Sequence, residues 1–241
     1  MGLSRRLHLR PRQAHRQTPA RVSRPCGIPA GRGVGDRRDL RGDARALYRE
    51  LPVRRAAIIG FAATLAALYL PSWRAVLGDF PAHMLRHMGL VAVAAPLLVL
   101  ALPDLARRFG PPVVLGAFFE FVVVWLWHLP VLHGWAQTEG AGTLFEQVMF
   151  LAAGWAVWAG ALSAREPLLG AGGLFLTSMH MTLLGAILIL APSDLYAEIC
   201  GRAPDLSGQQ LGGMLMLAIG TPIYILGGLA LTRRTLLGGL T

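Results

Sequence analysis

Two histidines one helical turn apart are the strongest chemical signal in this 241-residue sequence. His83 and His87 lie in the run HMLRHM, and a spacing of four residues places both imidazoles on one helix face, about 6 Å apart. That separation allows both rings to bind one metal ion. A methionine, Met84 or Met88, follows each histidine. Imidazole combined with thioether is a donor set that suits copper, and the thioether favours Cu(I).

Histidines and methionines in other apolar segments extend this candidate site. His128 ends one apolar run, His180 lies between two methionines inside another, and Met214 and Met216 lie in a third. We interpret His133 as a loop residue without a ligand role. The predicted metal-binding residues are His83, His87, His128, His180, Met88 and Met214.

Glu120 is an acid inside an otherwise apolar segment. At the rise of an α-helix it lies about 15 Å below Pro130, at a depth similar to that of His180. Ionisable side chains inside a bilayer are costly and usually functional. We therefore predict a functional role for Glu120.

Six apolar runs form the elements that must position these side chains, and each is near the ~20 residues that a bilayer core requires. The runs are continuous rather than alternating, and helices satisfy their own backbone hydrogen bonds in lipid, so helices are favoured over a barrel. The sequence predicts an all-α polytopic transmembrane helix bundle of about six spans within residues 56–235. The spans are expected near residues 56–72, 83–102, 112–130, 144–163, 168–191 and 209–231.

The arginines predict how this bundle lies in the membrane. Residues 1–55 hold 15 arginines against four acids, which is typical of a disordered cytoplasmic tail. Later arginines recur after the second, fourth and sixth spans, at Arg107, Arg108, Arg165, Arg233 and Arg234. Under the positive-inside rule both termini are cytoplasmic, so His83 and His87 lie toward the outer face.

Composition excludes several other classes of protein. The chain is 54% hydrophobic and 15% charged, whereas soluble domains carry about 25% charged residues. The net charge of +10 belongs to the tail, so we expect no nucleic-acid partner. Cys26 and Cys200 face opposite compartments and cannot form a disulfide. The glycines of residues 31–35 lack the strand and helix of a dinucleotide fingerprint, and no P-loop occurs, so we predict a protein that is not an enzyme.

Four motifs occur in a fixed order along the body of the chain: FPAHMLRHM at 80–88, WHLP at 127–130, MHMTLLGA at 179–186 and QQLGGMLM at 209–216. Together they resemble the CtaG-like integral membrane assembly factors associated with caa-type cytochrome c oxidases. The resemblance covers about residues 56–235. It implies a role in forming the copper-containing oxidase and adds Gln209 and Gln210 to the candidate functional residues.

The sequence departs from that family in two places. Relatives often have a Glu-His pair where this chain has Glu146 and Gln147, so one imidazole is absent. Relatives also often carry an acid at the position of Gly208, whereas here the nearest acid is Asp205.

The leading hypothesis is an assembly factor, multi-pass in the bacterial cell (inner) membrane, with the lipid bilayer and cytochrome c oxidase subunits as partners. It would bind Cu(I) at the outer face and hand it over. One alternative is a haem-binding redox protein, with His87 or His128 opposite His180. Another is a copper or proton transporter that uses Glu120 and His180. Against these, a pair of histidines one turn apart cannot bracket one haem iron, and no histidine or methionine continues inward from His180.

Overall fold

The computed structural model describes the backbone of residues 37–238 and the side chains of residues 51–237. The chain divides into two compact units, Met1–Arg45 and Ala46–Thr241, and the second contains every candidate residue. The predicted all-α fold is confirmed, since residues 37–238 contain helices and no strand. The expected disordered tail lies outside the described residues as far as residue 36, and from Arg37 the chain is helical.

Eleven α-helices and two π-helical segments make up the described chain. Their bounds are α1 Arg37–Tyr69, α2 Trp73–Leu77, α3 Asp79–Met88, η1 Gly89–Ala94, α4 Ala95–Ala101, α5 Pro103–Phe109, α6 Val113–Trp127, α7 Pro130–Thr138, α8 Gly140–Leu162, α9 Pro167–Leu190, α10 Leu206–Leu215, η2 Met216–Gly220 and α11 Thr221–Gly238.

Five of these helical stretches are long and apolar enough to cross a membrane, so the chain is a multi-pass membrane protein. They cover Leu51–Tyr69, Asp79–Ala101, Gly140–Leu162, Pro167–Leu190 and Leu206–Leu237. A sixth candidate is the pair α5 and α6, which is bent by 96°. With 15 residues, α6 alone is about 22 Å long, shorter than the ~30 Å bilayer core.

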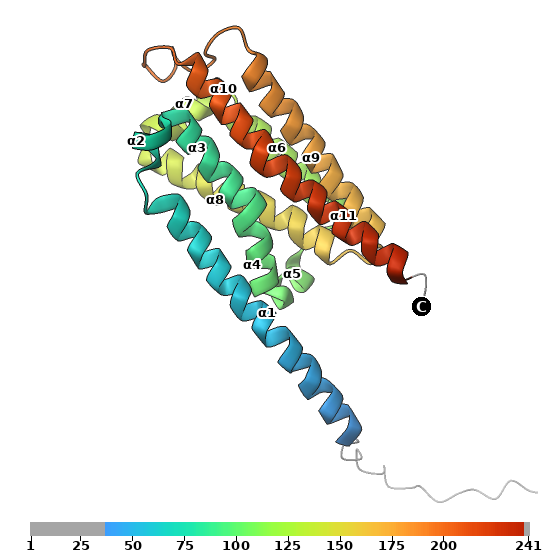
Figure 1. Ribbon diagram of the computed structural model, residues 1–241. Helices are drawn as coiled ribbons and strands as arrows, with labels where there is room; N and C mark the ends of the chain where they lie inside the picture. The colour runs from blue at the N-terminus through green and yellow to red at the C-terminus, as the bar shows by residue number, and fades with distance from the viewer. Residues whose placement is uncertain (1–36, 239–241) are drawn as a thin grey trace, which may run out of the picture. The chain divides into compact units, whose positions relative to one another are not determined.

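The second unit of the chain has two distinct ends (Figure 1). The short helices α2 and α7 lie at one end with the start of α10, and α5 lies at the other with the end of α11. Successive connections between spans therefore lie alternately at one end and at the other, as expected for a chain that crosses the membrane six times. Helix α3, which carries both histidines, begins at the end of α2 and α7.

Two spans change to π-helical geometry partway along, and a proline explains each change. Pro96 follows η1, and Pro222 follows η2. Proline has no backbone N–H, and its ring clashes with the carbonyl four residues earlier. In the turn before it, the backbone hydrogen bonds therefore join residues five apart instead of four, which is the π-helical pattern. The two π-helical segments meet, because a Cβ on Gly220 would lie 3.1 Å from the Met88 Sδ atom that precedes η1.

Glycines allow the backbones of neighbouring spans to come into direct contact. A Cβ on Gly116 of α6 would lie 2.7 Å from the Ala156 carbonyl oxygen and 2.9 Å from the Val157 Cα atom, both on α8. A Cβ on Gly154 would lie 2.8 Å from the Val91 Cα atom of η1. Lipid gives no hydrophobic drive for helix association, so such close packing is the main source of cohesion between spans.

The contact at Gly116 gives the first prediction. Replacing Gly116 with Ala forces a methyl group against the α8 backbone, and we expect it to lower the free energy of unfolding by about 1–3 kcal/mol. The matched control is Gly172→Ala in α9, where a Cβ meets no atom within 4 Å. Thermal unfolding in detergent should show a lower midpoint for Gly116→Ala only. Equal midpoints for the two variants would contradict the proposed close contact.

Candidate metal centre

Three buried side chains from two spans converge at the end of the bundle that holds α2 and α7. His83 and His87 project from α3, and Glu146 projects from α8. Glu146 Oε1 lies 3.1 Å from His83 Nε2, and Glu146 Oε2 lies 3.2 Å from His87 Nε2. One ligand atom from each residue lies within 4.8 Å of the other two, a spacing that one metal ion can span. All three side chains are at most 2% exposed.

The facing atoms are close, yet they are not aligned as hydrogen bonds. His83 Nε2, His87 Nδ1, His87 Nε2 and Glu146 Oε1 are all buried without a hydrogen-bond partner among the described residues. A buried polar atom without a partner costs about 1–3 kcal/mol. A cation between the three facing atoms, or a proton on one of the two imidazoles, would compensate them.

Two more imidazoles flank this triad. The His133 ring, on α7, lies 4.9 Å from the His83 ring, and the His128 ring, at the end of α6, lies 5.9 Å from the His87 ring. His128 Nδ1 contacts the Val124 carbonyl oxygen at 2.6 Å, which assigns the proton to that nitrogen and leaves Nε2 with its lone pair. His128 Nε2 and His133 Nδ1 are both buried and unpartnered.

A hydrogen-bonded chain from α1 orients the carboxylate. The Tyr69 hydroxyl donates to Gln147 Oε1 at 2.9 Å, and Gln147 Nε2 donates to Glu146 Oε2 at 3.3 Å. On the other side, the Phe150 ring stacks on the His87 ring with centroids 3.7 Å apart. Partners of this kind fix the rotamers of metal ligands and tune their basicity. Gln147 is therefore in place to position Glu146.

The loop between α9 and α10 covers the cluster. Tyr196 stacks on Phe80 with ring centroids 5.1 Å apart and lies 4.3 Å from the His133 ring, and its hydroxyl donates to the His128 carbonyl oxygen at 3.1 Å. Burial raises the pKa of Tyr196, so the hydroxyl stays protonated and keeps donating. Tyr196 thus links the loop to both flanking histidines.

Asp194 holds this loop in shape. Its carboxylate accepts from the Tyr196 amide at 2.9 Å and the Asp205 amide at 2.8 Å, and it pairs with Arg202 at 2.7 Å. Burial raises the pKa of Asp194, but the two amides and the Arg202 guanidinium outweigh that effect and hold the pKa below its ordinary value of 3.8.

A small polar pocket of about 160 Å³ reaches this cluster from the loop side. His133, Phe80 and Cys200 are among the residues that line it. Since the His133 ring also contacts the His83 ring, a single imidazole separates the pocket from the triad.

Glu120 lies in a different polar cluster. It is fully buried on α6, and the Tyr224 hydroxyl of α11 donates to its carboxylate. The same hydroxyl lies 3.2 Å from the Val91 carbonyl oxygen of η1, which also accepts from Trp158 Nε1 at 3.2 Å. Within residues 51–237, these contacts connect Glu120 to the π-helical segment and not to the triad.

His180, Met88 and Met214, the other predicted ligands, have the following surroundings. The His180 ring contacts Phe121 edge to face at 5.4 Å, and neither of its nitrogens has a partner among the described side chains. Met88 is fully buried with its sulfur against Gly220. Met214 is 49% exposed, whereas the histidine cluster is buried.

Gln209 and Gln210 fasten α10 to the end of α9. Gln209 Nε2 donates to the Leu188 carbonyl oxygen at 3.0 Å, and its Oε1 accepts from the Leu195 amide at 2.8 Å. Gln210 Nε2 donates to the Ile189 carbonyl oxygen at 3.2 Å. Both amides use their hydrogen-bonding groups within the fold, which gives them a structural part in supporting the covering loop.

Two residues of the cluster were missed by the sequence interpretation. The sequence interpretation mentions Glu146 only as the neighbour of Gln147, the position that departs from the family, although an acid inside an apolar span is the same signal that singled out Glu120. His133 was interpreted as a loop residue, but it lies in helix α7 and is 2% exposed. The signal for His133 was weak, because α7 is too short to show helical periodicity.

The family model described as cytochrome c oxidase caa3 assembly factor, Caa3_CtaG, matches residues 38–236. Comparison with curated proteins and with solved structures gives no match. The chain therefore belongs to the caa3 assembly factor family, which confirms the resemblance carried by the four motifs.

The contacts of Asp194 predict a pH-dependent stability. A carboxylate whose pKa is lower in the folded state contributes stability above its unfolded pKa and loses it as the pH falls through the folded value. We expect Asp194→Asn to lower the free energy of unfolding by about 1–3 kcal/mol at pH 7. The difference from wild type should shrink as the pH falls from 5 toward 3. Glu198→Gln, an exposed acid of the same loop, is the control for thermal unfolding across this range.

Proposed function

Given membership of the caa3 assembly factor family, we propose that the chain is a non-catalytic assembly factor of the bacterial inner membrane that binds copper at its outer face and transfers it to a cytochrome c oxidase subunit. His83, His87 and Glu146 are the proposed ligands, and the copper ion is the cargo. The observation that carries the proposal is the convergence of their unpartnered, buried nitrogen and oxygen atoms within 4.8 Å.

The charge of the cluster favours a monovalent ion. Burying an uncompensated charge in an apolar interior is strongly unfavourable. Glu146 supplies one negative charge and the neutral imidazoles supply none, so Cu(I) forms a complex with no net charge. A divalent ion would leave one positive charge in the bundle. Imidazole, which supplies two of the three proposed ligands, is a good ligand for copper.

The flanking histidines offer a route for transfer. His128 and His133 each keep a buried nitrogen without a partner, next to His87 and His83 respectively. An ion can therefore exchange imidazole ligands in short steps and reach the pocket beside Cys200 through His133. Several weak ligand sets in sequence suit a protein that must release its metal.

Copper binding by the purified protein tests this proposal. We expect about one Cu(I) per chain for wild type, measured with a competing chelator under reducing conditions. His83→Ala combined with His87→Ala should abolish this binding, and Glu146→Gln should weaken it, because the complex then carries a buried positive charge. The matched controls are His180→Ala, an unpartnered histidine outside the cluster, and Glu139→Gln, an exposed acid just before α8. Both controls should bind like wild type.

Two outcomes would contradict this assignment. Normal copper binding by the double histidine variant would remove the triad as the site. A Soret band in the absorption spectrum of the purified protein would favour the haem-binding alternative.

The maturation of the oxidase gives a second test. In cells that carry only the Glu146→Gln variant, we expect the oxidase to contain haem but less copper, because only copper delivery depends on the triad. Added copper should restore part of the activity. The measurement is the metal and haem content of the purified oxidase, with the Glu139→Gln strain as control. An oxidase with full copper content would disprove a delivery role for Glu146.

A further inference from the structure

A large pocket lies at the other end of the bundle from the metal centre. It has a volume of about 880 Å³, in the upper range of ligand pockets. Val99 and Leu100 of α4 and Leu162 of α8 line it. From His83 to Leu100 the chain continues for 17 residues of one span, which corresponds to about 25 Å of helix. The pocket therefore lies near the opposite membrane surface and is separate from the proposed copper site.

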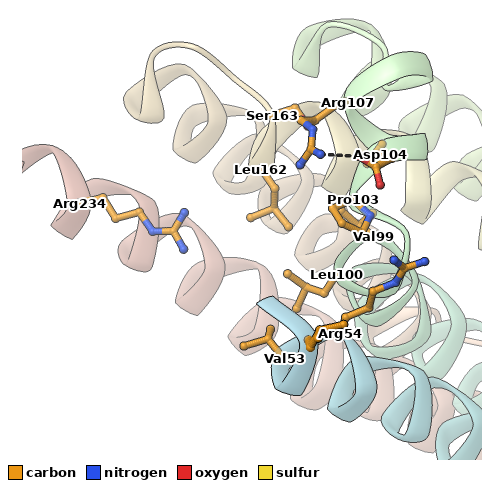
Figure 2. A pocket seen from close by; sticks show the side chains of 12 residues that line it. Val53, Arg54, Val99, Leu100, Pro103, Asp104, Arg107, Leu162, Ser163 and Arg234 are labelled. Carbon is orange, nitrogen blue, oxygen red and sulfur yellow. Dashed lines mark hydrogen bonds and ion pairs between the residues drawn. The ribbon is translucent and has the colours of Figure 1, made fainter. Parts of the chain in front are cut away.

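Three arginines from three separate helices surround the pocket. Arg54 comes from α1, Arg107 from α5 and Arg234 from α11, and apolar side chains lie between them (Figure 2). Asp104 is the one carboxylate in the lining, and it pairs with Arg107. The lining thus carries three positive charges and one negative charge.

The arginines are placed to receive an anion. Arg54 Nε donates to the Ala101 carbonyl oxygen at 2.9 Å, which fixes the side chain and leaves its two terminal nitrogens available. Within the described side chains, no carboxylate pairs with Arg54 or Arg234. Guanidinium groups form bidentate hydrogen bonds with phosphate oxygens, so this arrangement suits a phosphate group.

The rest of the lining indicates that the phosphate belongs to an amphiphile. Val53, Val99, Leu100 and Leu162 present hydrocarbon to the same space that the arginines border. Beyond the pocket, α1 continues with Ile58 and Ile59, which are 48% and 69% exposed. With a free phosphate bound, these apolar side chains would stay exposed to water, whereas the acyl chains of a lipid would cover them.

We propose that this pocket binds one anionic phospholipid, with its phosphate between Arg54, Arg107 and Arg234 and its acyl chains along the apolar lining. Basic pockets between spans are suited to anionic headgroups, and each arginine near the membrane surface contributes about a fivefold increase in affinity. The bound lipid would join α1 to the ends of α5 and α11, which the chain itself connects only weakly at this point.

The chain offers a closely matched test, because each of the three arginines has an arginine neighbour in sequence that does not line the pocket. The test variant is R54Q/R107Q/R234Q, and the control variant is R55Q/R108Q/R233Q, which removes the same charge from the same helices. Native mass spectrometry of full-length protein in mixed micelles would compare phosphatidylglycerol with phosphatidylcholine. Separate samples with inorganic phosphate would test a free anion.

We expect wild type and the control variant to retain one phosphatidylglycerol and to bind phosphatidylcholine more weakly. The test variant should lose about a hundredfold in phosphatidylglycerol affinity, the product of three fivefold effects. Equal losses in both variants would overturn the proposal in favour of general surface charge. Displacement of the lipid by millimolar inorganic phosphate would overturn it in favour of a free anion site. If the triple variant fails to fold, Arg234→Gln against Arg233→Gln gives the same comparison at two exposed positions, with an expected difference of about fivefold.

Discussion

The burial of one carboxylate is the constraint on which the site depends. Glu146 lies within a span and is shielded from solvent, so its charge can persist only if a positive or strongly polar group faces it. Its only close partners among the described side chains are Gln147 and the imidazoles of His83 and His87, which carry no charge when neutral. In the proposed site, one cation between these groups would neutralise the carboxylate and also occupy the unpartnered nitrogens.

The spacing of α3 and α8 determines whether these ligands can meet. Gly154 allows the α8 backbone to contact Val91, directly below the histidine pair, and a side chain there would separate the two spans. The proline-dependent π-helical segment η1 begins right after Met88 and so brings Val91 to this contact. The small residue Gly154 and the helix irregularity η1, next to the histidine pair, therefore help to set the distance between the carboxylate and the imidazoles.

The sequence predicted the all-helical membrane fold and the facing pair of His83 and His87, because both follow from local rules of hydropathy and helix periodicity. The membership of Glu146 depends on the rotation of α8 relative to α3, which a single sequence does not determine. The same uncertainty applies to Met88, since its sulfur packs on Gly220 in a contact between residues distant in sequence. The interpretation of His133 as a loop residue is wrong because its helix has only nine residues, too few for a clear hydropathy period in the sequence.

Glu120, the second buried acid, has a different set of partners. The Tyr224 hydroxyl donates to its carboxylate, whereas the Glu146 carboxylate faces two imidazoles and accepts from Gln147. Tyr224 and Trp158 both point to the Val91 carbonyl oxygen, one of the backbone groups in the widened register of η1. The Glu120 cluster therefore stabilises the irregular turn that places the histidine pair. The polar groups of the Glu120 cluster thus act on the candidate metal centre through the backbone of one span. No series of metal ligands between the two clusters is required.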